Sequence, residues 1–283
     1  MIANERRDDL KAIDQLTIIN SQQGLLAYLK QVWTYRSVAL AIARRDLKVR
    51  YSQTFLGILW AVIQPLTGLV IFTIFFDRLI KIAIPGMSYP VFAFSGMVSW
   101  FFFTHIVYNA GVSLVESQDL IRKVYFPRIL LLFAKTIVGL VEFGISMILL
   151  VALLFLHGYS TTWSIVFFPL FVVLNIAVGL SIALWLGALT IRYRDFHHII
   201  PYVVNFGIWL TPVFYPVTLI PARLEWLMYW NPMAATIAGF RWSLIGGAAP
   251  ARNYLLSFIP IIALLISGFA YFRKVEDQIS DYV

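Results

Sequence analysis

The sequence predicts an all-α integral membrane protein with six transmembrane helices, and three observations support this class. Hydrophobic residues make up 60% of the 283 residues and charged residues only 13%, whereas soluble domains carry about 25% charged residues. The mean hydropathy is +0.81. The apolar residues also form long continuous runs, as membrane-spanning helices of about 20 residues require. A membrane β-barrel would show short alternating segments instead.

Six apolar runs are long enough to cross a bilayer. Only the third run contains charged residues, which are Lys135 and Glu142. The fifth run is distinguished by four prolines at positions 201, 212, 216 and 221. The six runs cover residues 55–76, 91–115, 129–156, 163–191, 199–222 and 253–272.

The distribution of Lys and Arg predicts the orientation of the chain. An even number of spans puts both ends on one side, and that side carries 16 Lys and Arg residues against five on the other. Positive charge is retained on the cytoplasmic side, so both termini are expected in the cytoplasm. Residues 1–15 are highly charged and have neither the apolar run nor the cleavage site of a signal peptide, so residues 1–36 are expected to form a retained cytoplasmic tail.

The segment 37–52 alternates apolar and basic residues at helical spacing. This pattern predicts an amphipathic helix at the cytoplasmic interface, or more simply a basic anchor for the first span. Its basic side chains are Arg44, Arg45, Lys48 and Arg50.

Two segments between spans also have unusual compositions. Residues 116–128 are short and polar, which by spacing alone indicates a connecting loop. Residues 211–252 are rich in Pro, Gly and aromatic residues yet still apolar. This composition favours short re-entrant helices, while an interfacial belt of Trp and Tyr is the simpler alternative.

The sequence lacks the motifs of the common catalytic sites. It contains no cysteine, no P-loop, no zinc-protease motif and no nucleophile elbow. His197 and His198 are adjacent, so on a helix they diverge and make a poor chelate. We therefore expect neither a metal site nor an enzyme activity in this chain.

The two charges in the third span share one helix face, because they lie seven residues apart. Lys135 is close enough to the span's end to reach the interface. Glu142 lies deeper and needs a partner or a watery cavity. Either a role in transport or assembly, or a structural hydrogen bond, is consistent with this position.

The chain carries several motifs in a characteristic order. They are RYSQTFLGILWAVIQP (50–65), FSGMVSWFFF (94–103), LIRKVYFPR (120–128), RYRDF (192–196), WLTPVFYP (209–216) and WNPMA (230–234). Together these motifs resemble one known family, the permease subunits of ABC-2 type polysaccharide exporters. Those exporters carry O-antigen or capsule, and teichoic-acid exporters are their relatives. The resemblance runs from about residue 35 to the C-terminus, so residues 37–283 are expected to form the transmembrane domain.

The resemblance implies a half-transporter in the bacterial inner membrane. Two permeases would pair with two copies of a separate ATPase, which binds ATP and Mg; this chain itself would hold no cofactor and no nucleic acid. The substrate would be a polysaccharide on undecaprenyl diphosphate, most closely O-antigen. The loop after the second span would match the coupling helix that docks on the ATPase, with candidate residues Asp119, Arg122, Lys123 and Arg128.

Two sets of residues are candidates for contact with the substrate. Arg44, Arg45, Lys48 and Arg50 suit the diphosphate, because Arg binds phosphate oxygens bidentately, although anionic lipids would attract them equally. Aromatic side chains can stack on sugar rings, although most aromatic residues here pack in the core or against lipid. The aromatic candidates are Trp60, Trp100, Phe103, Trp209, Tyr215 and Trp230.

Two other functions remain as rivals. An ABC-2 exporter of small molecules would have the same overall organisation. A membrane enzyme that modifies glycans would need a convergent catalytic set, which the sequence does not show. The glycan itself, whether O-antigen, capsule or teichoic acid, is not fixed by the residues.

Overall fold

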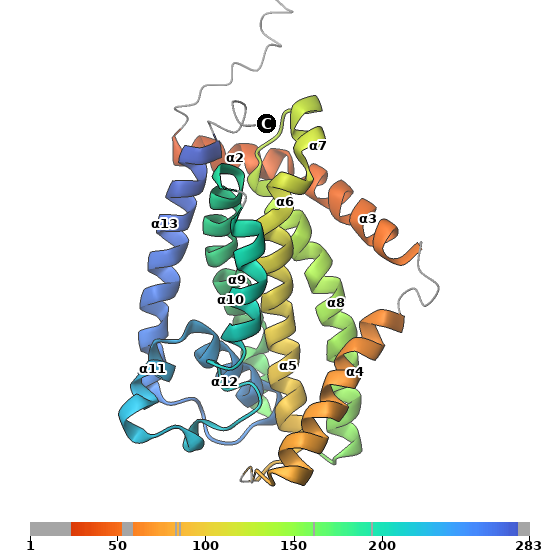
Figure 1. Cartoon of the computed structure of the whole chain (residues 1–283), viewed down its shortest axis with the longest axis vertical. Coiled ribbons are helices and arrows are strands. Elements are labelled where there is room, and N and C mark those ends of the chain that lie inside the picture. Colours follow the sequence, from red (N-terminus) through yellow and green to blue (C-terminus); the bar gives the residue numbers. More distant parts are fainter. Residues whose placement is uncertain are drawn as a thin grey trace, which may run out of the picture. The chain divides into compact units, whose positions relative to one another are not determined.

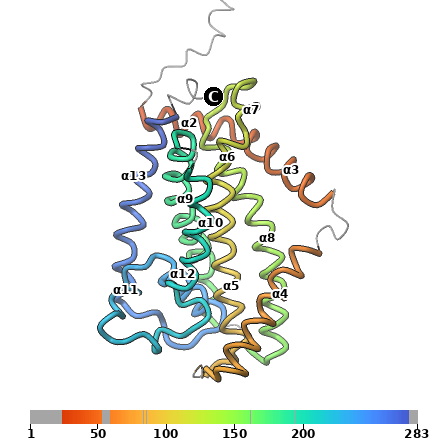
Figure 2. The backbone as a smooth tube through the Cα atoms, in the orientation of Figure 1, coloured from red at the N-terminus to blue at the C-terminus, as the bar shows by residue number. Residues whose placement is uncertain are grey.

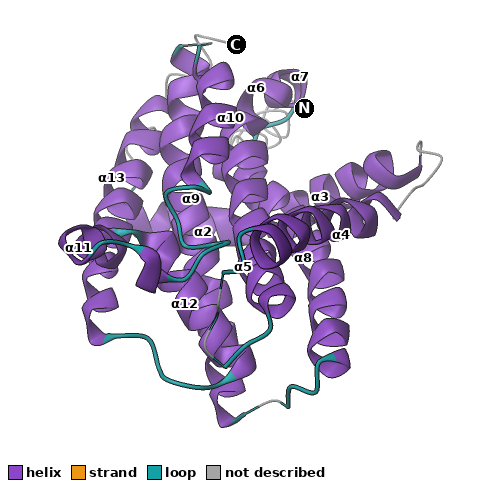
Figure 3. Cartoon of the chain, turned by 60° about the horizontal axis from the view of Figure 1, so that its bottom comes forward, coloured by secondary structure: helices purple, strands orange, loops and turns teal. Residues whose placement is uncertain are grey.

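The computed structural model describes residues 24–52, 59–82, 84, 86–160, 162–193 and 195–276. These residues form helices joined by loops, and none of them lies in a strand, which confirms the all-α class for the described chain (Figure 3). The chain divides into two compact units, Met1–Thr34 and Tyr35–Val283. Helix α2 (Leu25–Thr34) is the described element of the first unit, and most of the predicted tail lies outside the described residues.

Five helices of the second unit are long and apolar enough to cross a membrane. They correspond to the first, second, third, fourth and sixth predicted spans, and α8 has the predicted bounds at both ends. The start of the first predicted span lies outside the described residues. The five are α4 with its π-helical continuation η2 (Trp60–Leu79), α5 with η3 and α6 (Tyr89–Glu116), α8 (Ile129–Leu156), η4 with α9 (Trp163–Arg192) and η7 with α13 (Arg252–Glu276).

Helix α5 (Tyr89–His105) is the central helix of this unit (Figure 1). It contacts α4 (Trp60–Phe72), α8 and α9 (Phe168–Arg192), and nearly all of its side chains are buried. Helix α9 also packs closely on α13 (Phe258–Glu276). A Cβ atom on Gly268 would lie 2.8 Å from Cδ1 of Trp185, so this glycine permits the close approach that is typical of helix pairs in membranes.

The fifth predicted span is not a continuous helix. Helix α10 (Phe196–Gly207) has 12 residues, or about 18 Å at 1.5 Å per residue, which is less than the ~30 Å hydrocarbon core. The chain then turns through residues 208–215. Pro212 and Pro216 provide no backbone donors and disfavour a helical residue before them. A sixth span is therefore not confirmed.

Short helices follow this turn. They are η5 (Val217–Leu219), η6 (Ala222–Leu224), α11 (Glu225–Trp230) and α12 (Pro232–Ile245). The side chain of Asn231 caps α12 by accepting hydrogen bonds from the backbone of Met233 and Ala234, and Pro232 suits the first helical position. Short helices are therefore present in this segment, but their re-entry into a membrane stays a prediction.

The helix predicted at 37–52 is α3 (Arg36–Ser52). Ala39, Ile42 and Ala43 form its buried face, and the helix packs against α8. Helix α7 (Gln118–Lys123) and the C-terminal end of α13 lie at one end of the unit, whereas α11 lies at the opposite end (Figure 2). The position of α3 at a membrane interface is a prediction that remains untested.

Candidate functional site

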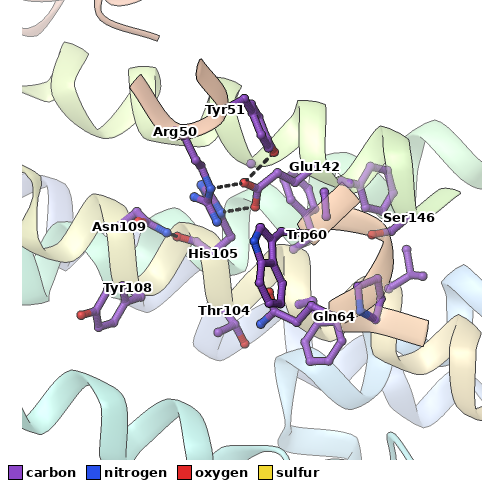
Figure 4. A pocket seen from close by; sticks show the side chains of 17 residues that line it. Arg50, Tyr51, Trp60, Gln64, Thr104, His105, Tyr108, Asn109, Glu142 and Ser146 are labelled. Carbon is purple, nitrogen blue, oxygen red and sulfur yellow. Dashed lines mark hydrogen bonds and ion pairs between the residues drawn. The ribbon is translucent and has the colours of Figure 1, made fainter. Parts of the chain in front are cut away.

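Glu142, the deeper charge of the third span, is the centre of a polar network (Figure 4). Its Oε1 lies 2.8 Å from Nε of Arg50 and accepts a hydrogen bond of 3.2 Å from the Tyr51 hydroxyl. Its Oε2 lies 2.9 Å from Nδ1 of His105. The network therefore joins the C-terminal end of α3, the C-terminal end of α5 and the middle of α8.

The contact with Glu142 determines which nitrogen of the His105 ring carries the hydrogen. A carboxylate can only accept hydrogen bonds, so Nδ1 of His105 carries the hydrogen and Nε2 of the neutral ring is an acceptor. This Nε2 is buried and has no hydrogen-bond partner among the described residues. A Cβ atom on Gly139 would lie 2.6 Å from Cδ2 of His105, so glycine at this position makes the space for the ring.

Tyr51 is held in its protonated form. Burial, reinforced by the negative charge of Glu142, raises the pKa of Tyr51 to about 12. The phenol therefore stays protonated at neutral pH, and its O–H donates a hydrogen bond to the carboxylate of Glu142.

Lys135 makes a second connection between α8 and α3. Its Nζ lies 3.1 Å from Oδ2 of Asp46 on α3 and 3.2 Å from Oε2 of Glu116 at the end of α6 (Gly111–Glu116). Lys135 and Glu142, seven residues apart on α8, thus face Asp46 and Arg50, four residues apart on α3. Along α8 the basic residue comes first, whereas along α3 the acidic residue comes first. Lys135 therefore pairs with Asp46, and Glu142 pairs with Arg50.

A cavity of about 410 Å³ lies beside the Glu142 network, between α3, α4, α5 and α8 (Figure 4). The indole of Trp60 forms part of its wall and is 52% exposed. The other lining residues that carry polar groups are Arg50, Tyr51, Gln64, Thr104, His105, Tyr108, Asn109, Glu142 and Ser146.

The four basic residues predicted to meet the diphosphate have different environments. Arg45 donates two hydrogen bonds to Asp46, of 3.1 and 2.9 Å, and Arg50 is paired with Glu142. Arg44 and Lys48 are exposed on α3, and no side-chain partner for either is found among the described residues. Of the four basic residues, Arg44 and Lys48 therefore have the charges that are least compensated by neighbouring carboxylates among the described residues.

The candidates for docking on an ATPase lie on and after α7. Asp119, Arg122 and Lys123 are exposed on this short helix. Arg128 has a different environment: its backbone N–H donates a 2.6 Å hydrogen bond to Oε1 of Glu276 on α13, and its guanidinium lies 5.4 Å from the centre of the Tyr125 ring. Arg128 thus connects the start of α8 to the end of α13.

The aromatic candidates separate into buried and exposed residues. Trp100 and Phe103 are 4% and 5% exposed, with ring centres 5.1 Å apart. Both therefore belong to the core of this chain and do not line an open surface of it. Trp60, Trp209 and Trp230 are about half exposed, and the Tyr215 hydroxyl donates to the carbonyl of Trp209.

Arg241 on α12, one of the five Lys and Arg residues counted on the side opposite the termini, is a second polar centre. Its guanidinium donates hydrogen bonds to the carbonyls of Phe92, Pro212 and Val213 and lies 3.7 Å from the centre of the Phe92 ring. A Cβ atom on Gly96 would lie 2.3 Å from Nη2 of Arg241. A lone arginine within the apolar stretch 232–245 was the available signal for this contact.

The described residues do not bring the histidines and carboxylates together into a cluster of metal ligands. No group of three His, Cys, Asp or Glu side chains among them converges as metal ligands would. His197 and His198 lie with ring centres 5.6 Å apart and nearly perpendicular. The two adjacent histidines therefore do not converge on one point.

Comparisons with known proteins place the chain among membrane transporters. Residues 38–245 match the ABC-2 type transporter family. The chain is 24% identical over 262 residues to the O-antigen export system permease protein RfbA of Myxococcus xanthus, covering 92% of this chain and 100% of that protein. It is 25% identical over 243 residues to the protein of the same name from Klebsiella pneumoniae, covering 86% and 93% of the two chains.

A third relative is named for a different polysaccharide. The polysialic acid transport protein KpsM of Escherichia coli is 24% identical over 251 residues, which cover 84% of this chain and 93% of KpsM. The family match extends from α3 to the last residue of α12 and so includes every helix that contacts the Glu142 network. The chain belongs to the ABC-2 type transporter family.

Proposed function

We propose that this chain is the membrane subunit of an ATP-driven exporter of polysaccharide linked to undecaprenyl diphosphate. O-antigen of lipopolysaccharide is the preferred cargo, and capsule or teichoic acid is the alternative. One observation carries the proposal: the chain aligns with 93–100% of the length of relatives named as O-antigen permeases. The relative named for polysialic acid transport supports the wider class of cargo.

The energy for export would come from a separate subunit. The sequence has no P-loop, so ATP and Mg would be bound by a partner ATPase. Helix α7 offers an exposed docking element whose first turn carries Asp119 and whose last turn carries Arg122 and Lys123. A homodimer of this chain with two ATPase subunits is the expected assembly.

We further propose six crossings of the bacterial cytoplasmic membrane, with both termini on the cytoplasmic side. Helix α10 and the irregular segment 208–215 would form the fifth crossing. Irregular backbone is tolerated within a membrane where protein surrounds it, and residues 211–214 are buried. Helices α11 and α12 would then be re-entrant elements at the outer side, and α3 would lie at the inner interface.

Reconstitution tests the proposed activity directly. The chain and its partner ATPase are placed in vesicles that contain undecaprenyl-diphosphate-linked polysaccharide, and the glycan that crosses the bilayer is measured with and without ATP. A partner ATPase without its P-loop lysine is the matched control. ATP-dependent movement of unaltered glycan is expected.

Two other results would contradict the proposal. ATP hydrolysis that responds to a drug but not to the lipid-linked glycan would indicate a small-molecule exporter. A covalent change in the recovered glycan would indicate an enzyme, because an exporter alters no covalent bond.

A further inference from the structure

The cavity beside Glu142 has hydrogen-bonding capacity that the protein does not use. His105 is 8% exposed, and its Nε2 has no partner among the described residues. Oγ1 of the adjacent Thr104 is also buried without a partner there. Both residues line the cavity. Because buried polar groups are nearly always satisfied, two such groups at one cavity indicate a ligand or water that supplies hydrogen-bonding partners.

The charges at the cavity favour an uncharged ligand. Arg50 and Glu142 form an ion pair of 2.8 Å, so their charges compensate one another. Nε2 of His105 has no hydrogen-bond partner among the described residues, and the polar groups of Gln64 and Ser146 are uncharged. An anion or a cation would find no unpaired opposite charge here, whereas a hydroxyl can both donate and accept.

Part of the cavity wall beside these polar groups is aromatic. Trp60 is half exposed, and its indole lies along the cavity next to the Glu142 network, with Gln64 one helical turn further along α4 (Figure 4). A flat aromatic face beside several neutral hydrogen-bonding groups suits a sugar ring, which has C–H groups on its faces and hydroxyls at its edge. The cavity volume of about 410 Å³ lies in the range of small-molecule sites.

We propose that this cavity binds an uncharged sugar ring, with Trp60 stacking on the ring and His105, Thr104 and Gln64 bonding its hydroxyls. The inference rests on the proposed export of polysaccharide and makes it more specific: the segment of cargo held here is a neutral sugar and not an acidic one.

Saturation-transfer NMR on the full chain tests this binding. The protein is placed in nanodiscs whose lipids carry no sugar, and the probes are the methyl glycosides of glucose, galactose and mannose, with glucuronic acid as the acidic comparison. Saturation transfer to at least one neutral glycoside is expected. Trp60→Ala should weaken its binding on the order of tenfold, since one stacking contact is removed.

A second variant tests the cavity without removing its aromatic wall. Ser146→Phe adds a large side chain to the lining of the cavity and should abolish the saturation transfer to the glycoside. Trp163→Ala is the matched control, because Trp163 is 69% exposed and lies outside the cavity; binding should be unchanged in it. Size-exclusion chromatography shows which variants remain folded, and Trp60→Phe retains a stacking face if Trp60→Ala does not fold.

Several results would overturn the inference. Absence of transfer from all three neutral glycosides would mean that the cavity holds only water. Transfer that survives both Trp60→Ala and Ser146→Phe would place the sugar elsewhere, and preferential binding of glucuronic acid would reverse the charge argument.

The inference and the proposed function can fail separately. Export of polysaccharide by a chain that binds no neutral glycoside refutes the sugar site alone. Glycoside binding in this cavity by a chain that exports no polysaccharide refutes the proposed function alone.

Discussion

Replacing Arg241 with methionine should release the turn at residues 212–214. In the wild type, the guanidinium donates to the carbonyls of Phe92, Pro212 and Val213, at 2.5–3.2 Å, and methionine donates nothing. A buried carbonyl without a donor costs about 1–3 kcal/mol. The Phe92 carbonyl keeps the Ser95 hydroxyl as a donor. The two carbonyls left without a donor, those of Pro212 and Val213, predict a loss of about 2–4 kcal/mol, less than the largest sum because neighbouring contributions are not additive.

Cysteine labelling measures this loss locally. The chain contains no native cysteine, so Val213→Cys introduces a single reporter at a position that is 0% exposed. Since 1.4 kcal/mol corresponds to a factor of ten, the open state of the turn should become about 30-fold or more populated in Arg241→Met. Maleimide labelling at position 213 should accelerate accordingly.

A matched control separates this effect from a general loss of arginine. Arg252 is exposed at the start of η7 (Arg252–Ser257), and Arg252→Met should leave the labelling rate unchanged. If position 213 stays protected in Arg241→Met, then the carbonyl contacts do not hold the turn and the reasoning is refuted.

Three further predictions concern the Glu142 network and α7. Glu142→Gln should lower the free energy of unfolding by about 1–3 kcal/mol, because the bonds from His105 and Arg50 lose their charge; thermal melting measures this. Arg122→Glu combined with Lys123→Glu should reduce co-purification of the partner ATPase on the order of tenfold while the permease stays folded, whereas Lys274→Glu, exposed on α13, should not. Folding raises the pKa of Tyr51 from its usual value to about 12, so its contribution to stability is complete below pH ~10 and is lost as the pH rises towards 12. The difference in tyrosinate absorbance between wild type and Tyr51→Phe should therefore have its midpoint near pH 12.

Each of these predictions has a result that contradicts it. Equal melting temperatures for wild type and Glu142→Gln would show that the carboxylate charge does not stabilise the network. Normal ATPase association of the double α7 variant would remove α7 from the docking surface. A Tyr51 midpoint near pH 10 would mean that solvent reaches the phenol.

The long helices could be predicted because their signal is local. Residues 129–156 form one apolar run that follows Pro127 and ends before Gly158, which has φ +74°, so α8 was predicted at both ends. The fifth run has the same apolar character, but its prolines interrupt the backbone hydrogen bonding. Hydropathy does not register this interruption, and α10 therefore ends at Gly207, far short of the predicted end at 222.

The site could be predicted only in part, because its contacts join distant segments. The sequence indicated that Glu142 needs a partner, but Tyr51 and His105 lie 91 and 37 residues away from it. The bonds from Arg241 to Phe92 cross 149 residues. Such pairings depend on how the helices pack, and no spacing rule within one element reveals them.

The double connection between α3 and α8 has a mechanical consequence. A helix attached to its neighbour at one point can pivot about that point. Here Lys135 and Glu142 hold α3 at two points seven residues apart, which is about 10 Å along α8. Two contacts fix both the distance between the two helices and the angle at which they cross. Helices α3 and α8 should therefore move as one rigid body. Any tilt imposed on α3 would reach the Glu142 cavity through α8, and would not be absorbed at the contact between the two helices.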